Sequence, residues 1–156
     1  MKKTYFLLTI FLVLAIGSFE VKTTPPENQW QRGSGSTYYL KGFLPMKRNE
    51  AQDWCVLMGG NLAEPRSPEE TSVINEIIGE EEKTYWIGLQ KVQDVWRWSS
   101  DNAGIEDYSN WCSSCPNGES EKCAVIDSYL GKYWDDYLCG QISYNYPFFA
   151  LCQKTL

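Results

Sequence analysis

The sequence predicts an α+β fold in which two helices accompany antiparallel sheets and a long functional loop. Two segments in the first half carry apolar residues at the three- and four-residue steps of helices. Most strand-like segments, rich in β-branched and aromatic residues, follow them as a block. Because helices and strands are segregated along the chain, an antiparallel sheet is favoured over a parallel α/β sheet.

A strand at residues 37–40 opens the pattern, and the first helix follows it. The glycines at residues 59–60 would end this helix, because Gly favours the backbone of a helix C-terminus. The residues that would share the buried face of the helix are Ala51, Trp54, Cys55 and Met58.

The second helix has a clear start signal. Ser67 is a suitable N-cap, Pro68 stands at the first helical position and Glu70 completes a capping box. Gly79 would end the helix. The residues of its apolar stripe are Val73, Ile74, Ile77 and Ile78.

Strand patterns then occur at residues 85–89, 95–98, 123–126 and 147–152. Between them, residues 99–120 are rich in Ser, Asn, Asp and Gly and show little periodicity. Long loops of this kind are uncommon in compact domains and are usually functional. The loop is therefore the first place to expect a site.

Residues 1–17 have the features of a signal peptide. Lys2 and Lys3 form a positive start, residues 5–16 are mostly apolar, and a small-x-small pattern ends at Gly17. A membrane span would need about 20 apolar residues. The prediction is therefore a secreted, extracellular protein without a membrane span, with an extended segment at residues 18–29 and one domain at residues 30–156.

Charge and composition exclude several function classes. Loss of Lys2 and Lys3 leaves 12 basic against 20 acidic residues, which disfavours nucleic acid and anionic membranes and suits calcium. The chain has no His, so it has no Ser-His-Asp triad, Cys-His dyad or His-ligated zinc site. A glycosidase would need paired carboxylates, but Asp135 and Asp136 would point to opposite faces of a strand. No enzyme is predicted.

Six Cys residues in an exported chain indicate a disulfide framework, and the sequence alone leaves 15 pairings open. Several short motifs accompany them in order. They are Ala51-x-x-x-Cys55 with Gly-Gly-Asn-Leu-Ala at 59–63, Trp-Ile-Gly-Leu at 86–89, Trp-Arg-Trp-Ser at 96–99, Asn110-Trp111, Trp134-Asp135-Asp136-x-x-Cys139 and Phe-Ala-Leu-Cys at 149–152.

These motifs, spread over residues 30–153, resemble the C-type lectin-like domain family in its short form. The resemblance implies the disulfides Cys55–Cys152 and Cys123–Cys139. Cys112 and Cys115 then remain, and a bond between them would stiffen the loop. The alternatives for this pair are a redox Cys-x-x-Cys motif, a four-cysteine zinc site and an inter-chain bond that makes a homo-oligomer.

The resemblance also implies a calcium and sugar site. Family members with that activity use a Glu/Gln-Pro-Asn/Asp triplet, a later Glu and the Asn-Asp of a Trp-Asn-Asp motif. Calcium is a hard cation that takes six to eight oxygen ligands, and two of them can be sugar hydroxyls. The matching residues, proposed to bind both calcium and carbohydrate, are Asn117, Glu121, Asp135 and Asp136.

Cys115 is the departure from this pattern, because it stands where the triplet has Glu or Gln and because sulfur is a poor calcium ligand. Asp135 also replaces the usual Asn. The expected function is a calcium-dependent lectin of innate immunity, with Asn117 favouring mannose-type ligands. The alternative is a lectin-like domain that binds protein or another surface without calcium-dependent sugar recognition. Tyr129, Tyr133 and Tyr137 could stack on a sugar or pack internally.

Overall fold

The computed structural model describes residues 29–142 and 146–156, so the expected signal peptide and nearly all of the segment after it lie outside the described residues. The elements are β1 (Gln31–Arg32), β2 (Thr37–Lys41), α1 (Arg48–Leu57), β3 (Asn61–Leu62), α2 (Pro68–Ile78), β4 (Thr84–Val92), β5 (Val95–Trp98), β6 (Cys123–Asp127), the 3-10 turn η2 (Ser128–Leu130), β7 (Tyr133–Tyr137) and β8 (Phe148–Thr155). Both α-helices and the strands β2, β4, β5, β6 and β8 fall in segments where the sequence pattern indicates them, whereas β7 has no strand pattern of its own among those predicted.

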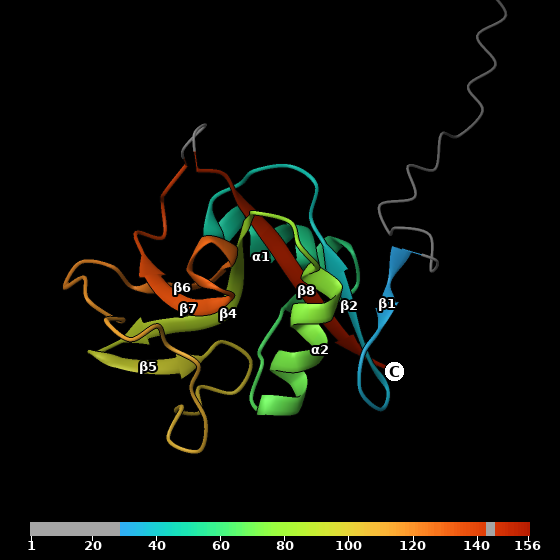
Figure 1. Ribbon diagram of the computed structural model, residues 1–156, viewed down its shortest axis with the longest axis horizontal. Coiled ribbons are helices and arrows are strands. Elements are labelled where there is room, and N and C mark those ends of the chain that lie inside the picture. Colours follow the sequence, from blue (N-terminus) through green and yellow to red (C-terminus); the bar gives the residue numbers. More distant parts are fainter. Residues whose placement is uncertain (1–28, 143–145) are drawn as a thin grey trace, which may run out of the picture.

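The strands form one mixed sheet in the order β1-β2-β8-β4-β6-β7, with β3 added to β8 and β5 added to β4 (Figure 1). All pairs are antiparallel except β4 and β8, which run parallel. The expectation of purely antiparallel sheets is therefore wrong at this one pair. A parallel pair needs a long crossover, and β5, the long loop, β6 and β7 provide it between β4 and β8.

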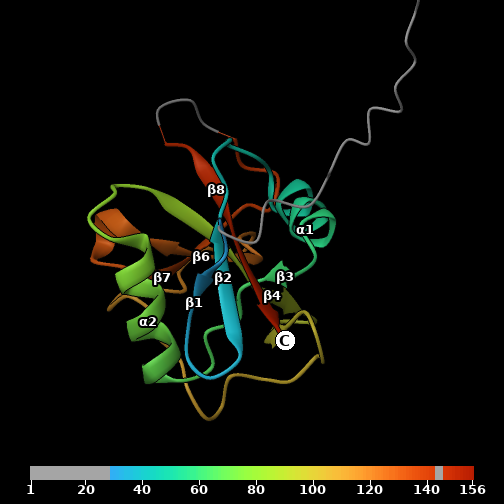
Figure 2. The same cartoon turned by 90° about the vertical axis from the view of Figure 1, so that its right-hand side faces the viewer.

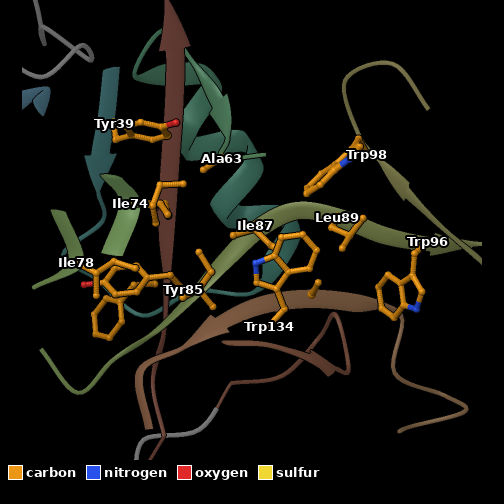
Figure 3. Packing of buried hydrophobic residues seen from close by; sticks show 14 residues of the cluster. Tyr39, Ala63, Ile74, Ile78, Tyr85, Ile87, Leu89, Trp96, Trp98 and Trp134 are labelled. Atoms are coloured by element: carbon orange, nitrogen blue, oxygen red, sulfur yellow. The ribbon is translucent and has the colours of Figure 1, made fainter. Parts of the chain in front are cut away.

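The two helices lie on opposite sides of β2 and β8 (Figure 2). On one side α2 buries Ile74 and Ile78 in a core with Tyr85, Ile87 and Leu89 of β4 (Figure 3). On the other side α1 buries Ala51 and Cys55 against Trp86, Leu40 and Leu62. Because successive strand residues face opposite ways, β4 supplies side chains to both cores.

The start of α2 differs in one detail from the predicted capping box. Ser67 Oγ accepts a hydrogen bond from the Glu70 backbone N–H at 3.2 Å, as expected for an N-cap. The Glu70 carboxylate, however, accepts from the Arg66 N–H at 2.7 Å and not from Ser67. The capping hydrogen bonds thus reach back to Arg66, one residue before the N-cap. At the other end of the helix, Gly79 has φ 67° and ends it.

Three disulfides hold the fold together: Cys55–Cys152, Cys123–Cys139 and Cys112–Cys115. The first joins α1 to β8 across 97 residues of sequence. In the chain-entropy account a bond over such a loop stabilises the fold by about 4–5 kcal/mol. The third is local and lies in the long loop before β6, so it shapes that loop and not the core.

Candidate functional site

The long loop is attached to β7 through the backbone of Trp134. Trp111 and Trp134 form an isolated parallel bridge. The Cys112 N–H donates to the Trp134 carbonyl at 2.9 Å, and the Trp134 N–H donates to the Asn110 carbonyl at 2.7 Å. The indole of Trp134 is buried, with the rings of Trp98, Tyr108 and Trp111 edge-on to it at 5.7–5.8 Å. This anchor places the loop beside the next two residues of the strand.

Those residues, Asp135 and Asp136, lie on opposite faces of β7, as a strand requires. Asp136 is 2% exposed, whereas Asp135 is half-buried on the outer face. Two carboxylates that point apart cannot act together on one glycosidic bond. The arrangement therefore provides two separate acidic groups, each meeting a different part of the loop.

Asp136 holds the turn that contains the Pro-Asn pair. Its Oδ1 accepts the Asn117 backbone N–H at 2.8 Å, and its Oδ2 accepts the Gly118 N–H at 2.9 Å. The peptide bond between Cys115 and Pro116 in this turn is cis. Asn117 itself is exposed, with its side chain on the surface of the loop. The buried Asp136 carboxylate thus binds two backbone N–H groups, and the side-chain amide of Asn117 stays available to a ligand.

Asp135 meets the loop disulfide. Its Oδ1 lies 2.7 Å from Cys115 Sγ and accepts the Asp136 backbone N–H at 2.9 Å. A disulfide sulfur carries no hydrogen, so the sulfur contact is a hydrogen bond only when Asp135 is protonated. Burial, followed by the charge of Asp136, raises the pKa of Asp135 and favours that protonated form.

Glu121 completes the acidic group. Its carboxylate lies against Gly118, where an added Cβ would displace the Glu121 side chain from this position. Burial and the charges of Asp136 and Asp135 raise the pKa of Glu121. Within the described parts of the chain, no Lys or Arg forms an ion pair with any of these three carboxylates.

The donor set fits a hard cation in its chemistry. Asn117, Glu121, Asp135 and Asp136 all lie where the long loop contacts β7, and three of them are carboxylates without an ion-pair partner in the described residues. They do not yet converge: among residues 29–142 and 146–156, one set of His, Cys, Asp and Glu has ligand atoms within 4.8 Å of one another, namely Cys112, Cys115 and Asp135. Since both sulfurs are in a disulfide, that set offers no thiolate.

The three tyrosines have different places. The Tyr137 hydroxyl donates to Asp127 Oδ2 at 3.4 Å, so Tyr137 packs within the protein. Tyr129 is 44% exposed, and its ring lies 4.6 Å from that of Tyr146. Tyr133 is 50% exposed and lines a hollow of about 510 Å³ with Trp111 and the loop disulfide segment. Of the three, Tyr133 is the one that lines this hollow beside the loop.

Several functional contacts had no signal in the sequence. The backbone donors of Asn117 and Gly118, and the close approach of Glu121 to Gly118, depend on how the loop folds back on β7. The glycine directly after the Pro-Asn pair was the one clue to a close approach. In the described parts of the chain, no helix has the length and apolar character of a membrane span.

Comparison with known proteins identifies the family. The family described as the Lectin C-type domain matches residues 44–154. E-selectin of Equus caballus is 29% identical over 129 residues, which cover 78% of this chain and 21% of that protein, so the chain spans about a fifth of that relative. Dromaiocalcin-1 of Dromaius novaehollandiae is 32% identical over 130 residues, covering 78% of this chain and 88% of that protein.

Solved structures agree with this match. A calcium-independent type II antifreeze protein superposes with a TM-score of 0.68 at 29% identity, over 85% of this chain and 95% of that chain. The carbohydrate-recognition domain of cow CD23 was solved in the presence of a GlcNAc2Man3 oligosaccharide. It superposes with a TM-score of 0.70 at 27% identity, over 85% of this chain and 97% of that chain. With the family match extending over well more than half of its length, this chain belongs to the Lectin C-type domain family.

Proposed function

We propose that this protein is a secreted, calcium-dependent lectin that binds glycans in innate immune defence. The observation that carries the proposal is the group formed by the carboxylates of Glu121, Asp135 and Asp136. The pKa values of Glu121 and Asp135 are raised, Asp136 is buried, and none of the three has an ion-pair partner in the described chain. Such a group repels itself, and a divalent cation relieves that repulsion.

The residues that would hold calcium are Asn117, Glu121, Asp135 and Asp136. Calcium bound there would coordinate two sugar hydroxyls directly. The chain's own part is to position the ligands: Asp136 holds the turn through the Asn117 and Gly118 amides, and Asn117 presents its side chain at the surface. Asn117 belongs to the mannose-type triplet, so mannose-like glycans are the preferred class. The proposed action is binding and not catalysis.

A glycan array tests this proposal. Binding to mannose-type glycans is expected in calcium, and it should disappear when calcium is removed. Glu121→Gln removes one charge from the site with little change in shape and should weaken binding by about tenfold or more. Glu119→Gln is the matched control, because Glu119 is exposed on the same loop and is not among the proposed ligands. Glycan binding that survives both calcium removal and Glu121→Gln would refute the proposal.

A second function is favoured by the loop disulfide. Cys115 Sγ occupies the space beside Asp135, and both Asp136 oxygens accept backbone amides, so the protein's own groups hold the loop against β7. The likeness to a calcium-independent antifreeze protein agrees with this reading. The candidate function is binding of a protein or other surface without calcium. A tight partner that is insensitive to chelator, together with a silent glycan array, would select this function.

A further inference from the structure

A polar cavity of about 330 Å³ lies apart from the loop site, between the start of α1, β3, β4 and the turn after β5. None of its lining residues belongs to the proposed calcium set. The side chains that line it are hydroxyls, amides and two buried charges. They include Arg48, Gln52, Asn61, Glu64, Gln90 and Ser99.

Arg48 is a buried cation that shares its cavity with the Glu64 carboxylate but forms no ion pair with it. It is 6% exposed, and its Nη2 donates to Ser99 Oγ at 2.6 Å, a neutral partner. Its Nε is buried without a hydrogen-bond partner. No ion pair among the described residues includes Arg48. Burying an unpaired charge is costly, so a compensating ligand would stabilise this arrangement.

The position of Arg48 in its helix adds to this cost. Arg48 is the first residue of α1, where the helix dipole presents partial positive charge and favours anions. Burial lowers the pKa of Arg48, and the charge of Glu64 offsets part of that shift. A cation at this end is unfavourable for the helix dipole, although Glu50 in the same turn supplies a negative charge. The unsatisfied Arg48 Nε and the missing ion pair are therefore what favours an added anion.

Glu64, the nearest candidate counter-ion, is already engaged elsewhere. Its Oε1 accepts the Ser100 N–H at 2.9 Å, and its Oε2 accepts the Ser100 hydroxyl and pairs with Arg66. It is 3% exposed and forms no ion pair with Arg48. Glu64 thus stays negatively charged beside the cavity, where it repels a dianion more strongly than a monoanion.

We propose that this cavity binds the carboxylate of an acidic sugar, with Arg48 as the residue that recognises the anionic group. A guanidinium presents a planar fork that matches a carboxylate. The neutral lining of Gln52, Asn61, Gln90 and Ser99 offers amide and hydroxyl groups suited to sugar hydroxyls. The negative charge of the Glu64 carboxylate favours a monoanion over phosphate or another dianion.

The test is calorimetric titration of the whole protein with glucuronate, glucose and acetate. The buffer is stripped of divalent cations by a chelating resin, because soluble chelators are themselves carboxylates and because this condition silences the proposed calcium site. Glucuronate should bind, glucose should not, and acetate should bind more weakly than glucuronate. Equal binding of acetate and glucuronate would refute the role of the hydroxyls, and binding of glucose as tight as glucuronate would refute the role of Arg48.

Variants locate the site. Arg48→Gln should weaken glucuronate binding by about tenfold or more, since a charge-assisted pair is lost. Arg32→Gln, at an exposed arginine outside the cavity, is the matched control and should leave binding unchanged. Gln90→Leu narrows the cavity while keeping Arg48 and serves if Arg48→Gln does not fold; it should also weaken binding. Unchanged glucuronate affinity in the folded variants, or no glucuronate binding by the unaltered protein, would overturn the proposal.

Discussion

Cys115 Sγ lies 2.7 Å from Asp135 Oδ1, so the disulfide of the long loop touches the outer carboxylate of β7 directly. The cysteine that breaks the lectin triplet is therefore placed beside one of the proposed calcium ligands. Asp136, on the other face of the strand, holds the same loop through two backbone amides. Residues on both faces of β7 therefore hold the loop in place.

Replacing the disulfide with a carboxylate should strengthen calcium binding. The double variant Cys112→Ser with Cys115→Glu supplies a fourth acidic ligand beside Asp135, and more ligand charge raises calcium affinity, here by about tenfold. Calorimetric titration with calcium measures the change. The matched control, Cys112→Ser with Cys115→Ser, opens the loop without adding charge. If the two variants bind calcium equally, the triplet position does not contribute a ligand.

Calcium binding should weaken on acidification, beginning at a higher pH than ordinary carboxylates would predict. Burial and neighbouring charges raise the pKa values of Glu121 and Asp135, so protons compete with the cation earlier. Titrations from neutral pH down through the ordinary range of carboxylate pKa values measure this loss. In Glu121→Gln the pH dependence should be shallower. An affinity that is constant over this range would contradict the coupling.

Without calcium, the same two groups should affect unfolding in the opposite sense. Their folded-state pKa values are raised, so the folded protein binds protons more tightly than the unfolded chain. The stability that they contribute is therefore present at low pH and is lost as pH rises through the raised values. Relative to the unaltered protein, Asp135→Asn should gain thermal stability above that window, as measured by melting in calcium-free buffer.

Glu81 should show normal acid destabilisation. It pairs with Lys41 at 2.7 Å and Lys83 at 2.6 Å, and these hydrogen bonds lower its pKa from 4.5 to about 2. Its stabilisation is thus present above pH 4.5 and is lost as pH falls toward about 2. Because the side chain is 41% exposed, Glu81→Gln should cost about 1 kcal/mol or less at neutral pH. Urea unfolding at neutral and acidic pH measures the difference, which should vanish in acid.

Trp134 should be the main anchor of the loop. Trp134→Ala removes a buried indole from a cluster of three aromatic rings and should cost about 3–5 kcal/mol. Trp134→Phe keeps an aromatic ring and loses no hydrogen bond, since the buried Nε1 has no partner, so it should cost roughly 1–2 kcal/mol. Chemical denaturation compares the two. Equal losses would contradict an anchoring role for ring packing.

The helices and most of the longer strands could be predicted because their signals are local. Ser67, Pro68 and Gly79 mark the ends of α2, and Ile74 and Ile78 are buried as their spacing indicates. The parallel pairing of β4 with β8 had no such signal, because it depends on where the chain's last strand inserts. The two-residue strands β1 and β3 are too short to show a pattern.

The sequence by itself determined the family, the two helices, and the acidic residues of the loop and β7, because apolar spacing, capping residues and motif order are properties of neighbours along the chain. Only the tertiary structure decided that Cys115 meets Asp135, that Asp136 binds the Asn117 and Gly118 amides, and that Arg48 is buried beside a cavity and forms no ion pair among the described residues. These contacts join groups far apart in sequence, so they follow from the path of the folded backbone and not from any local pattern.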